Sequence, residues 1–288
     1  MNPADPAQAI TIVIPVYRDE PATRACLESV AASELPQGSS VLVIDDASPE
    51  PALREFCASF CKAHGYTLLA NDSNQGFVRT ANIGLAHDPG ADVVLLNSDT
   101  AVANDWLARL QRHAYASDNI GTVTPFSNNG TICSYPVFAD ASAMPEGWSV
   151  AQLDQLCARA NEGMSAPLPT AVGFCMYIRR DCLAQVGLFD AEQFGQGYGE
   201  ECDFSLRAAA LGWRNLLAAD VFVFHSGNAS FGSQSDGRKQ AADKVMHALH
   251  PHYDQLVSDF LQQDPLRPLR QRVDLQRLSD RPDDLSQV

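Results

Sequence analysis

The first hundred residues alternate between short apolar runs and segments whose apolar residues recur at helical spacing. The apolar runs are the length of buried strands, and the segments between them have the period of amphipathic helices. Strands that alternate with helices in this way form a mostly parallel sheet flanked by helices, so the sequence predicts an α/β fold. The predicted strands are 10–15, 41–44, 66–70 and 91–96, and the predicted helices are 21–33, 51–64 and 77–86.

The pattern is less regular after residue 104. Asn104 is expected to cap a helix that starts near Trp106. Residues 124–169 are rich in Ser, Asn, Gly and Pro and are expected to form irregular loops. Residues 227–237 are rich in Gly and Ser, which favours a flexible lid. Further expected elements are strands at 171–179 and 221–224 and helices at 200–211 and 240–261.

Chain length and composition set the expected domain organisation. With 288 residues the chain lies in the upper range of a single α/β domain. We expect one main domain over residues 9–231, a helical appendage over 232–264, and a polar, solvated tail over 265–288.

Charge and cysteine usage restrict the expected partners and compartment. A formal net charge of −15 argues against binding to nucleic acid or anionic lipid. No run approaches the 18 apolar residues of a membrane span, and residues 1–6 have no secretory signal pattern, so we expect a cytoplasmic protein. The eight cysteines contain no C-x-x-C pair and are expected to be reduced and packed.

Polar residues follow two of the predicted strands directly. Asp45 and Asp46 end the run 41–44, and Asn97, Ser98 and Asp99 follow the run 91–96. The carboxyl ends of parallel strands form one edge of the sheet, where α/β folds bind ligands. Asp45 and Asp46 could cap a turn, but we favour a contact with a nucleotide base or ribose. Asp99 could cap a helix, but we favour a divalent cation on a diphosphate.

A second acidic cluster follows the glycines at 195, 197 and 199. Glu200, Glu201 and Asp203 fall in the first turn of a predicted helix, and Asp203 is spaced to form a structural pair with Arg207. Glu200 and Glu201 point to different faces, so one of them can reach a pocket as a general base. The helix N-terminus is expected to keep that base ionised, without a raised pKa.

Histidine and basic residues complete the candidate site. His225 ends the run 221–224 and is a suitable Mn²⁺ ligand beside a carboxylate. Arg79 is a candidate to hold a diphosphate, although we favour an exposed helical arginine at this position. Arg238 and Lys239 follow the Ser/Gly stretch and could close over phosphates.

These motifs together resemble the family-2 inverting glycosyltransferases with the GT-A fold, and the resemblance covers roughly Ile10 to Phe231. The Asn-Ser-Asp-Thr motif is similar to the rhamnosyltransferase and galactofuranosyltransferase-like branch. The segments that carry the resemblance are 12–17, 45–48, 74–77, 97–100, 173–179, 200–203 and His225.

The resemblance implies a metal-dependent transfer of a sugar from a UDP or dTDP donor to a hydroxyl of a glycan or lipid-linked glycan, as in polysaccharide biosynthesis. Asp99 and His225 would hold Mn²⁺ or Mg²⁺, and Glu201 would be the base with Glu200 as its rival. Other glycosyltransferase domains are candidate partners. The implied donor-binding residues are Pro15, Tyr17, Asp45, Asp46, Asn74, Gly76, Arg79, Asn97 and Ser98.

The sequence departs from the family pattern at two positions. Asn97 stands where many relatives have Asp, which makes metal binding more dependent on Asp99 and His225. Glu201 stands where Asp is usual, so its side chain is one methylene longer.

Other functions fit the sequence less well. A sugar nucleotidyltransferase needs a glycine-rich basic loop after its first strand, whereas residues 16–20 are acidic and contain no glycine. The Rossmann and P-loop glycine motifs do not occur there either, and a glycosidase would not need a nucleotide pocket. A non-catalytic domain that binds a glycan or a nucleotide sugar stays open, and a donor-hydrolysis assay with Mn²⁺ would separate it from an enzyme.

Overall fold

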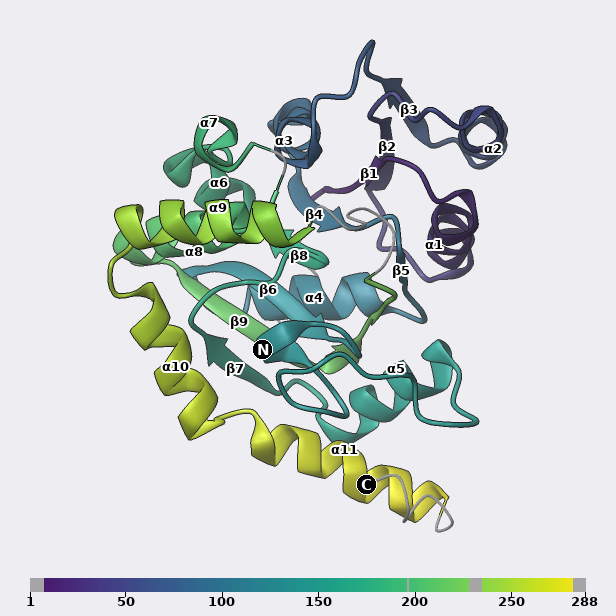
Figure 1. Ribbon diagram of the computed structural model, residues 1–288. Coiled ribbons are helices and arrows are strands. Elements are labelled where there is room, and N and C mark those ends of the chain that lie inside the picture. Colours follow the sequence, from purple (N-terminus) through teal and green to yellow (C-terminus); the bar gives the residue numbers. More distant parts are fainter. Residues whose placement is uncertain (1–7, 196, 228–234, 282–288) are drawn as a thin grey trace.

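The computed structural model describes residues 8–195, 197–227 and 235–281, and these are built around an eight-stranded sheet in the order β3-β2-β1-β4-β8-β6-β9-β7 (Figure 1). Strands β8 and β7 run antiparallel to their neighbours and the other pairings are parallel. The strands are β1 Ile10–Val16, β2 Ser39–Asp45, β3 Thr67–Ala70, β4 Asp92–Leu96, β6 Ile120–Phe126, β7 Ser165–Leu168, β8 Cys175–Ile178 and β9 Arg214–Phe222.

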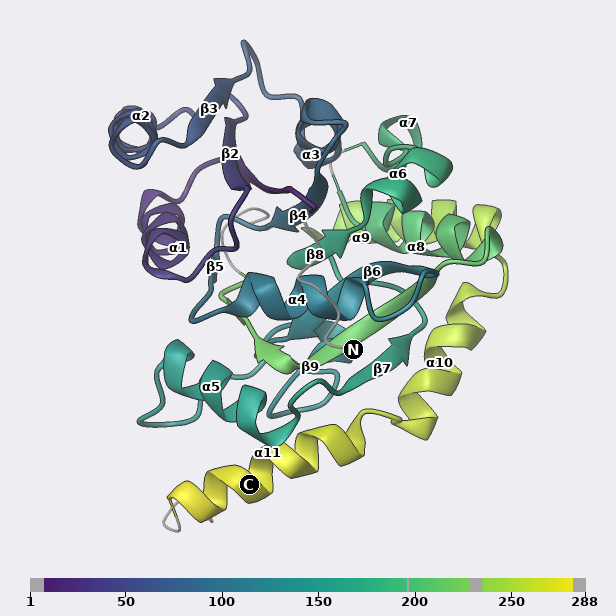
Figure 2. The same ribbon diagram turned by 180° about the vertical axis from the view of Figure 1, so that it is seen from behind.

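Helices cover both faces of this sheet (Figures 1 and 2). Because β1 is buried on both faces, it is apolar except for Thr11. Ile12 and Ile14 pack with residues of α1, α2 and α4, while Val13 packs with residues of α3 and α8. The helices are α1 Glu20–Ala32, α2 Pro51–His64, α3 Phe77–His87, α4 Trp106–Ala114, α5 Val150–Ala160, α6 Arg180–Val186, α7 Ala191–Phe194, α8 Glu200–Ala210, α9 Ser235–Leu249, α10 Tyr253–Gln263 and α11 Arg267–Asp280.

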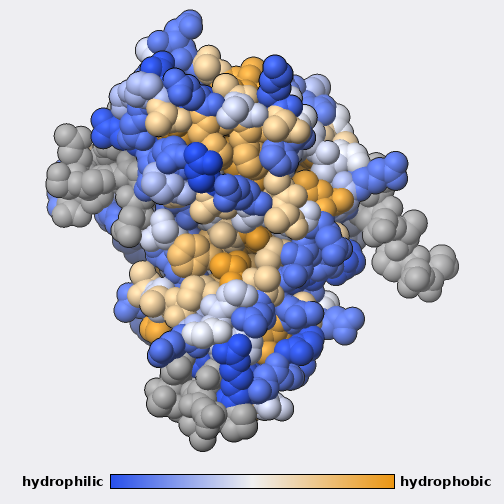
Figure 3. All heavy atoms as spheres, turned by 90° about the vertical axis from the view of Figure 1, so that its right-hand side faces the viewer, coloured by the Kyte–Doolittle hydropathy of each residue, from blue (hydrophilic) through white to orange (hydrophobic). Residues whose placement is uncertain are grey.

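The predicted α/β fold with a mostly parallel sheet is confirmed, and the first four strands and three helices lie where the hydrophobic pattern places them. The face that carries α1, α2 and α5 mixes hydrophilic and hydrophobic residues (Figure 3). None of the helices in the described ranges combines the length and the apolar character needed to cross a bilayer.

The prediction of irregular structure over residues 124–169 holds for most of residues 127–149 but is wrong for most of the remainder. This stretch contains the end of β6, a short 3-10 helix at Thr131–Cys133, helix α5 and strand β7. Helix α5 begins with a capping box, in which the Ser149 side chain accepts from the Gln152 amide and Gln152 accepts from the Ser149 amide. Its apolar face packs with β9 and α11 in a third core cluster.

Two other local predictions are corrected. Asn104 does not cap α4; its side-chain amide donates instead to the Ala151 carbonyl and to Asp154. The single helix expected at 240–261 is two helices, α9 and α10, which are separated at Pro251 because proline cannot continue a helix.

The solvated tail expected over 265–288 is wrong for residues 267–280, which form α11. This helix buries Leu269 and Val273 against α5 and β9. The domain division at residues 231 and 264 stays a prediction, and most of the lid expected at 227–237 lies outside the described residues.

Candidate active site

A pocket of about 330 Å³ opens at the carboxyl ends of β1 and β4, beside the N-terminus of α8. It gathers residues from segments that are more than 200 positions apart in the chain. The predicted site residues that line it are Pro15, Asn97, Ser98, Asp99, Glu200, Glu201 and His225, and the pocket is completed by Phe77, Asn129, Thr131, Val172, Gly173, Phe174, Gly197, Tyr198, Gly227 and Lys239.

A small second sheet brings Asp99 and His225 together. Strand β5 (Thr100–Ala101) pairs antiparallel with β10 (Phe224–His225), and His225 lies opposite Thr100. The Ser226 amide then donates to the Asp99 carbonyl at 3.0 Å, which continues the pairing. As a result, His225 Nε2 lies 3.4 Å from Asp99 Oδ1.

The two side chains are oriented by their other contacts. Asp99 Oδ2 accepts from the Gly227 amide at 3.0 Å and from Ser226 Oγ at 3.3 Å. His225 Nδ1 lies 2.8 Å from the Asn129 carbonyl, so this nitrogen carries the proton and donates. Asp99 Oδ1 and His225 Nε2 are therefore the atoms left for a ligand.

Burial and mutual contact set the titration of this pair. Burial raises the pKa of Asp99, but its hydrogen bonds from His225, Gly227 and Ser226 outweigh burial and lower the pKa overall. Burial lowers the pKa of His225, but the contact with Asp99 outweighs it and raises that pKa. Each group thus favours the charged form of the other.

The pair fits one divalent cation. Two ligand atoms with bonds of about 2.1 Å to one ion lie about 3.0 Å apart at a right angle, and farther apart as that angle opens. The observed 3.4 Å is compatible with this geometry. A carboxylate oxygen with an imidazole nitrogen suits Mn²⁺. Among the described residues no cluster of three His, Cys, Asp or Glu side chains could hold a metal, so a cation here would need further ligands from a substrate or water.

Glu200 and Glu201 face the same pocket from the first turn of α8. Each has a buried Oε2 atom with no hydrogen-bond partner among the described residues. Burial raises the pKa of Glu200 well above its ordinary value, and the neighbouring Glu201 raises it further. Burial also raises the pKa of Glu201, against smaller opposing effects of the backbone N–H groups of the helix start. The expectation of a base without a raised pKa is therefore wrong, because desolvation outweighs the helix terminus.

Asn97 provides a third unpaired acceptor. Its side-chain Oδ1 is buried and has no partner among the described residues. Hydrogen-bond acceptors that are buried without partners are costly, and they are satisfied when a ligand brings donors. Asn97, Glu200 and Glu201 thus line the pocket with acceptors that a ligand with hydrogen-bond donors could satisfy.

Several predicted donor-binding residues lie outside the pocket lining. Asp46 is 3% exposed, and its carboxylate accepts from the Asn71 side chain and from the Gln75 and Gly76 amides. Asp45 accepts from the Ser48 amide at 2.8 Å, as the turn interpretation expects. Asn74 is exposed, and its amide reaches the Asp46 carbonyl at 3.5 Å. Asp45 and Asp46 therefore fix the loops that follow β2 and β3.

The aromatic and basic candidates are placed as follows. Tyr17 follows β1 and lies under the guanidinium of Arg18 at 5.2 Å. Arg79 is exposed on α3. Lys239 lines the pocket, with its Nζ 5.3 Å from the centre of the Tyr198 ring. The donor, metal and catalytic roles of all the site residues stay predictions.

Three contacts in the site could not be expected from the sequence. Asn128 exchanges hydrogen bonds with the His225 backbone at 2.9 and 3.0 Å, and the Phe174 ring stacks on His225 with centres 5.4 Å apart. Gly227 has a positive φ of 72°, and a Cβ atom there would lie 1.9 Å from Asn129 Nδ2. Asparagine in a loop gives no periodic signal, so these partners are visible only in three dimensions.

Comparison with solved structures identifies the fold. The chain superposes on GalNAc-T7 with UDP, GalNAc and Mn²⁺ with a TM-score of 0.65 and 16% identity, over 97% of this chain and 57% of that one. It superposes on a mannosyltransferase, PcManGT from Pyrobaculum calidifontis with GDP-Man and Mn²⁺, with a TM-score of 0.55 and 17% identity, over 95% and 86% of the chains. The fold is therefore GT-A, that of nucleotide-sugar transferases.

Sequence comparison gives the family. A model of glycosyl transferase family 2 matches residues 11–187, and the chain belongs to this family. It is 23% identical over 218 residues to glycosyltransferase AglE of Haloferax volcanii, covering 75% of this chain and 66% of AglE. It is 25% identical over 135 residues to glycosyltransferase GlyA of Streptococcus pneumoniae serotype 4, covering 46% of this chain and 19% of GlyA.

Proposed function

We propose that this glycosyltransferase is inverting and metal-dependent, and that it moves a sugar from a UDP or dTDP donor to a hydroxyl of a glycan or lipid-linked glycan. One observation carries the proposal: the pair formed by Asp99 and His225 and the pair formed by Glu200 and Glu201 line the same pocket. The structural neighbours named above are complexes with Mn²⁺ and UDP or GDP-Man, which supports a nucleotide and a metal in this fold.

Asp99 and His225 would hold the cation through Oδ1 and Nε2. When bound, a divalent cation neutralises the negative charge of a departing diphosphate. Asn97 and Glu200 offer acceptors that would fix the hydroxyl groups of the transferred sugar. In this arrangement the donor is oriented by side chains on rigid strand ends and on the start of one helix.

Glu201 would take the proton of the acceptor hydroxyl as that oxygen attacks the anomeric carbon. The attack comes from the side opposite the leaving group, so the anomeric configuration inverts in one step without a covalent intermediate. A base accepts a proton more readily when its pKa lies closer to the working pH, and burial moves the pKa of Glu201 in that direction. Glu200 is the rival for this role because it lines the same pocket.

The test is sugar transfer by Glu201→Gln. General-base catalysis contributes about 10²–10⁴-fold in rate, so turnover should fall by that factor while donor affinity stays close to that of the wild type. Glu55→Gln, an exposed position in the middle of α2, is the matched control. A Glu201→Gln variant that keeps most of its activity would show that Glu201 is not the base.

The donor is identified by thermal stabilisation with a panel of nucleotide sugars, with and without Mn²⁺. A UDP or dTDP sugar that stabilises the protein only with Mn²⁺ is the expected result. Stabilisation without donor hydrolysis or transfer would favour the non-catalytic binding domain. Membership of the glycosyl transferase family argues against a sugar nucleotidyltransferase, and the rhamnosyl- or galactofuranosyltransferase-like branch stays a prediction.

A further inference from the structure

Strand β9 leaves its regular pairing with β6 just before it reaches the active site. The parallel register runs to Pro125 opposite Ala218 and then jumps to Phe126 opposite Phe222. Residues 219–221 therefore bulge out of the ladder, and their backbone groups need partners other than β6.

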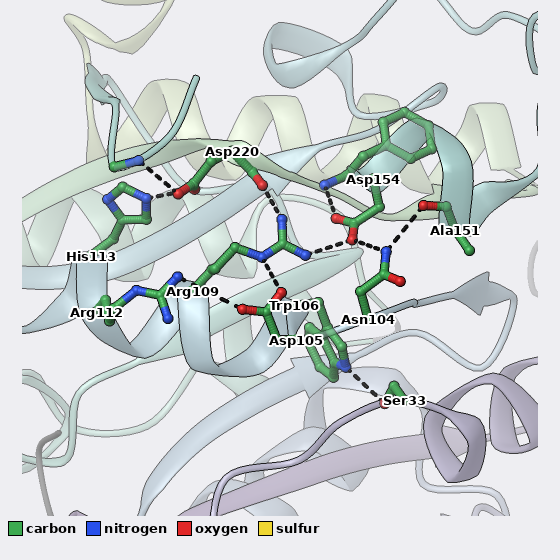
Figure 4. A network of polar contacts seen from close by, with 12 residues as sticks. Ser33, Asn104, Asp105, Trp106, Arg109, Arg112, His113, Ala151, Asp154 and Asp220 are labelled. Atoms are coloured by element: carbon green, nitrogen blue, oxygen red, sulfur yellow. Dashed lines mark hydrogen bonds and ion pairs between the residues drawn. The ribbon is translucent and has the colours of Figure 1, made fainter. Parts of the chain in front are cut away.

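Buried side chains from α4, from α5 and from the residue that ends α5 hold the bulge and the residue after it (Figure 4). Arg109 Nη1 donates to the Asp220 carbonyl, and Asp154 Oδ1 accepts from the Phe222 amide at 3.0 Å. The side chain of Asn161, which is fully buried, donates to the Ala219 carbonyl at 3.2 Å. The bulge is thus held by side chains that lie far from it in the sequence.

Arg109 and Asp154 form an ion pair at the centre of this network. Arg109 Nη2 lies 2.5 Å from Asp154 Oδ2, and the two side chains are 3% and 0% exposed. The Asn104 amide donates to the same Asp154 oxygen at 2.7 Å. Because desolvation offsets most of the attraction within a buried ion pair, such a pair is weak evidence for a stabilising role. Its contacts with the β9 backbone indicate a positioning role.

The bulge lies just before His225 in the chain. Only two residues separate Phe222 from His225, and in that distance the chain passes from the central sheet into β10. We propose that Arg109 and Asp154 are positioning residues for the metal site: by holding the bulged end of β9, they place His225 Nε2 beside Asp99 Oδ1. This inference rests on the proposed function, in which His225 binds the cation.

The test compares Asp154→Asn with Asp92→Asn. Asp92 is a matched control because its carboxylate is also buried and also accepts from three donors, which are Tyr115, Tyr177 and the Arg180 amide. It is the first residue of β4, whereas the active-site pocket lies at the carboxyl end of that strand. Mn²⁺ affinity in the presence of UDP is measured by electron paramagnetic resonance. Amide hydrogen exchange over residues 219–227 is measured without metal or nucleotide. Urea unfolding reports the stability of each variant.

Asp154→Asn should weaken Mn²⁺ binding about tenfold to a hundredfold, as changes to groups that orient a metal ligand do. It should also speed amide hydrogen exchange over residues 219–227. Asp92→Asn should lower the stability by a similar amount but change neither the Mn²⁺ affinity nor the exchange of these residues. If Asp154→Asn does not fold, the double variant Arg109→Met/Asp154→Leu removes both charges together and should show the same two effects.

Equal Mn²⁺ affinity and equal exchange in the Asp154 and Asp92 variants would overturn the inference. Wild-type protein that does not bind Mn²⁺ with UDP would instead overturn the metal assignment of the proposed function. In that case the exchange experiment still decides whether Arg109 and Asp154 hold the β9 bulge.

Discussion

Replacing Glu200 by glutamine is expected to stabilise the fold at neutral and alkaline pH. The side chain is 4% exposed, its Oε2 atom has no partner among the described residues, and Glu201 is adjacent. Leaving a buried polar group unsatisfied costs about 1–3 kcal/mol, and more when the group is charged. The amide of glutamine has nearly the same shape and is equally without a partner, but it carries no charge, so Glu200→Gln should recover the additional cost of the charge, on the order of 1 kcal/mol or more at pH 8.

The pH dependence gives the sign of the effect. Burial and the neighbouring Glu201 raise the pKa of Glu200, so the native state holds a proton that the unfolded state releases above pH 4.5. The stability that this group contributes is present below that pH and is lost as the pH rises through the raised pKa. The advantage of Glu200→Gln should therefore be small near pH 4.5 and grow towards pH 8.

Urea unfolding at several pH values between 4.5 and 8 measures this difference. Glu55→Gln on the exposed face of α2 is the control and should change stability by less than about 0.5 kcal/mol at any pH. A Glu200→Gln variant that is less stable than the wild type at pH 8, or whose difference does not change with pH, would refute the interpretation of Glu200 as an uncompensated buried acid.

Three further predictions concern the cation site. Asp99→Ala should weaken Mn²⁺ and donor binding together, at least tenfold by titration calorimetry, and unchanged donor affinity would contradict the assignment of Asp99. Because the pKa of His225 is raised above 6.5, a cation must displace its proton, so Mn²⁺ affinity should rise as the pH increases through that pKa. An Mn²⁺ affinity that does not change from pH 6 to pH 8 would argue against His225 as a ligand. Gly227→Ala should lower the free energy of unfolding measured in urea by about 1–2 kcal/mol, because alanine disfavours a φ of 72° and its Cβ would clash with Asn129. An unchanged free energy of unfolding would contradict this prediction.

Much of the fold follows from local patterns in the sequence. The runs at β1, β2 and β4 are apolar because these strands are buried on both faces, and proline and left-handed glycine bound α2 at Pro51 and Gly65. Strand β6 and helix α5 were missed for a physical reason. Serine, asparagine and glycine around them suit loops, and burial against β9 and α11 overrides that weak preference.

The site was predicted in part because strand ends and helix starts are local features. Asp99, Glu201 and His225 each follow such a boundary, and the topology brings them to one pocket. Asp46 also follows a buried strand, but its carboxylate accepts hydrogen bonds from backbone and side-chain donors of residues 71–76 and does not line the pocket. An acidic residue after a buried strand therefore indicates the edge of the sheet. Whether its carboxylate faces a ligand depends on whether donors from the protein already occupy its oxygen atoms.

The positions of the metal-site atoms depend on contacts that no local pattern encodes. His225 is oriented by the Asn129 carbonyl and the Asn128 side chain, and β9 reaches it through a bulge held by Arg109 and Asp154. Each of these partners is between 68 and 111 residues away in the sequence from the residue it holds. Two apolar neighbours in the core could be exchanged with a modest loss of packing, whereas a buried ion pair tolerates no loss of either partner. These contacts depend on particular partners that lie far apart in the sequence, so no local pattern predicts them and a single substitution disrupts them. The comparison of Asp154→Asn with Asp92→Asn uses that sensitivity.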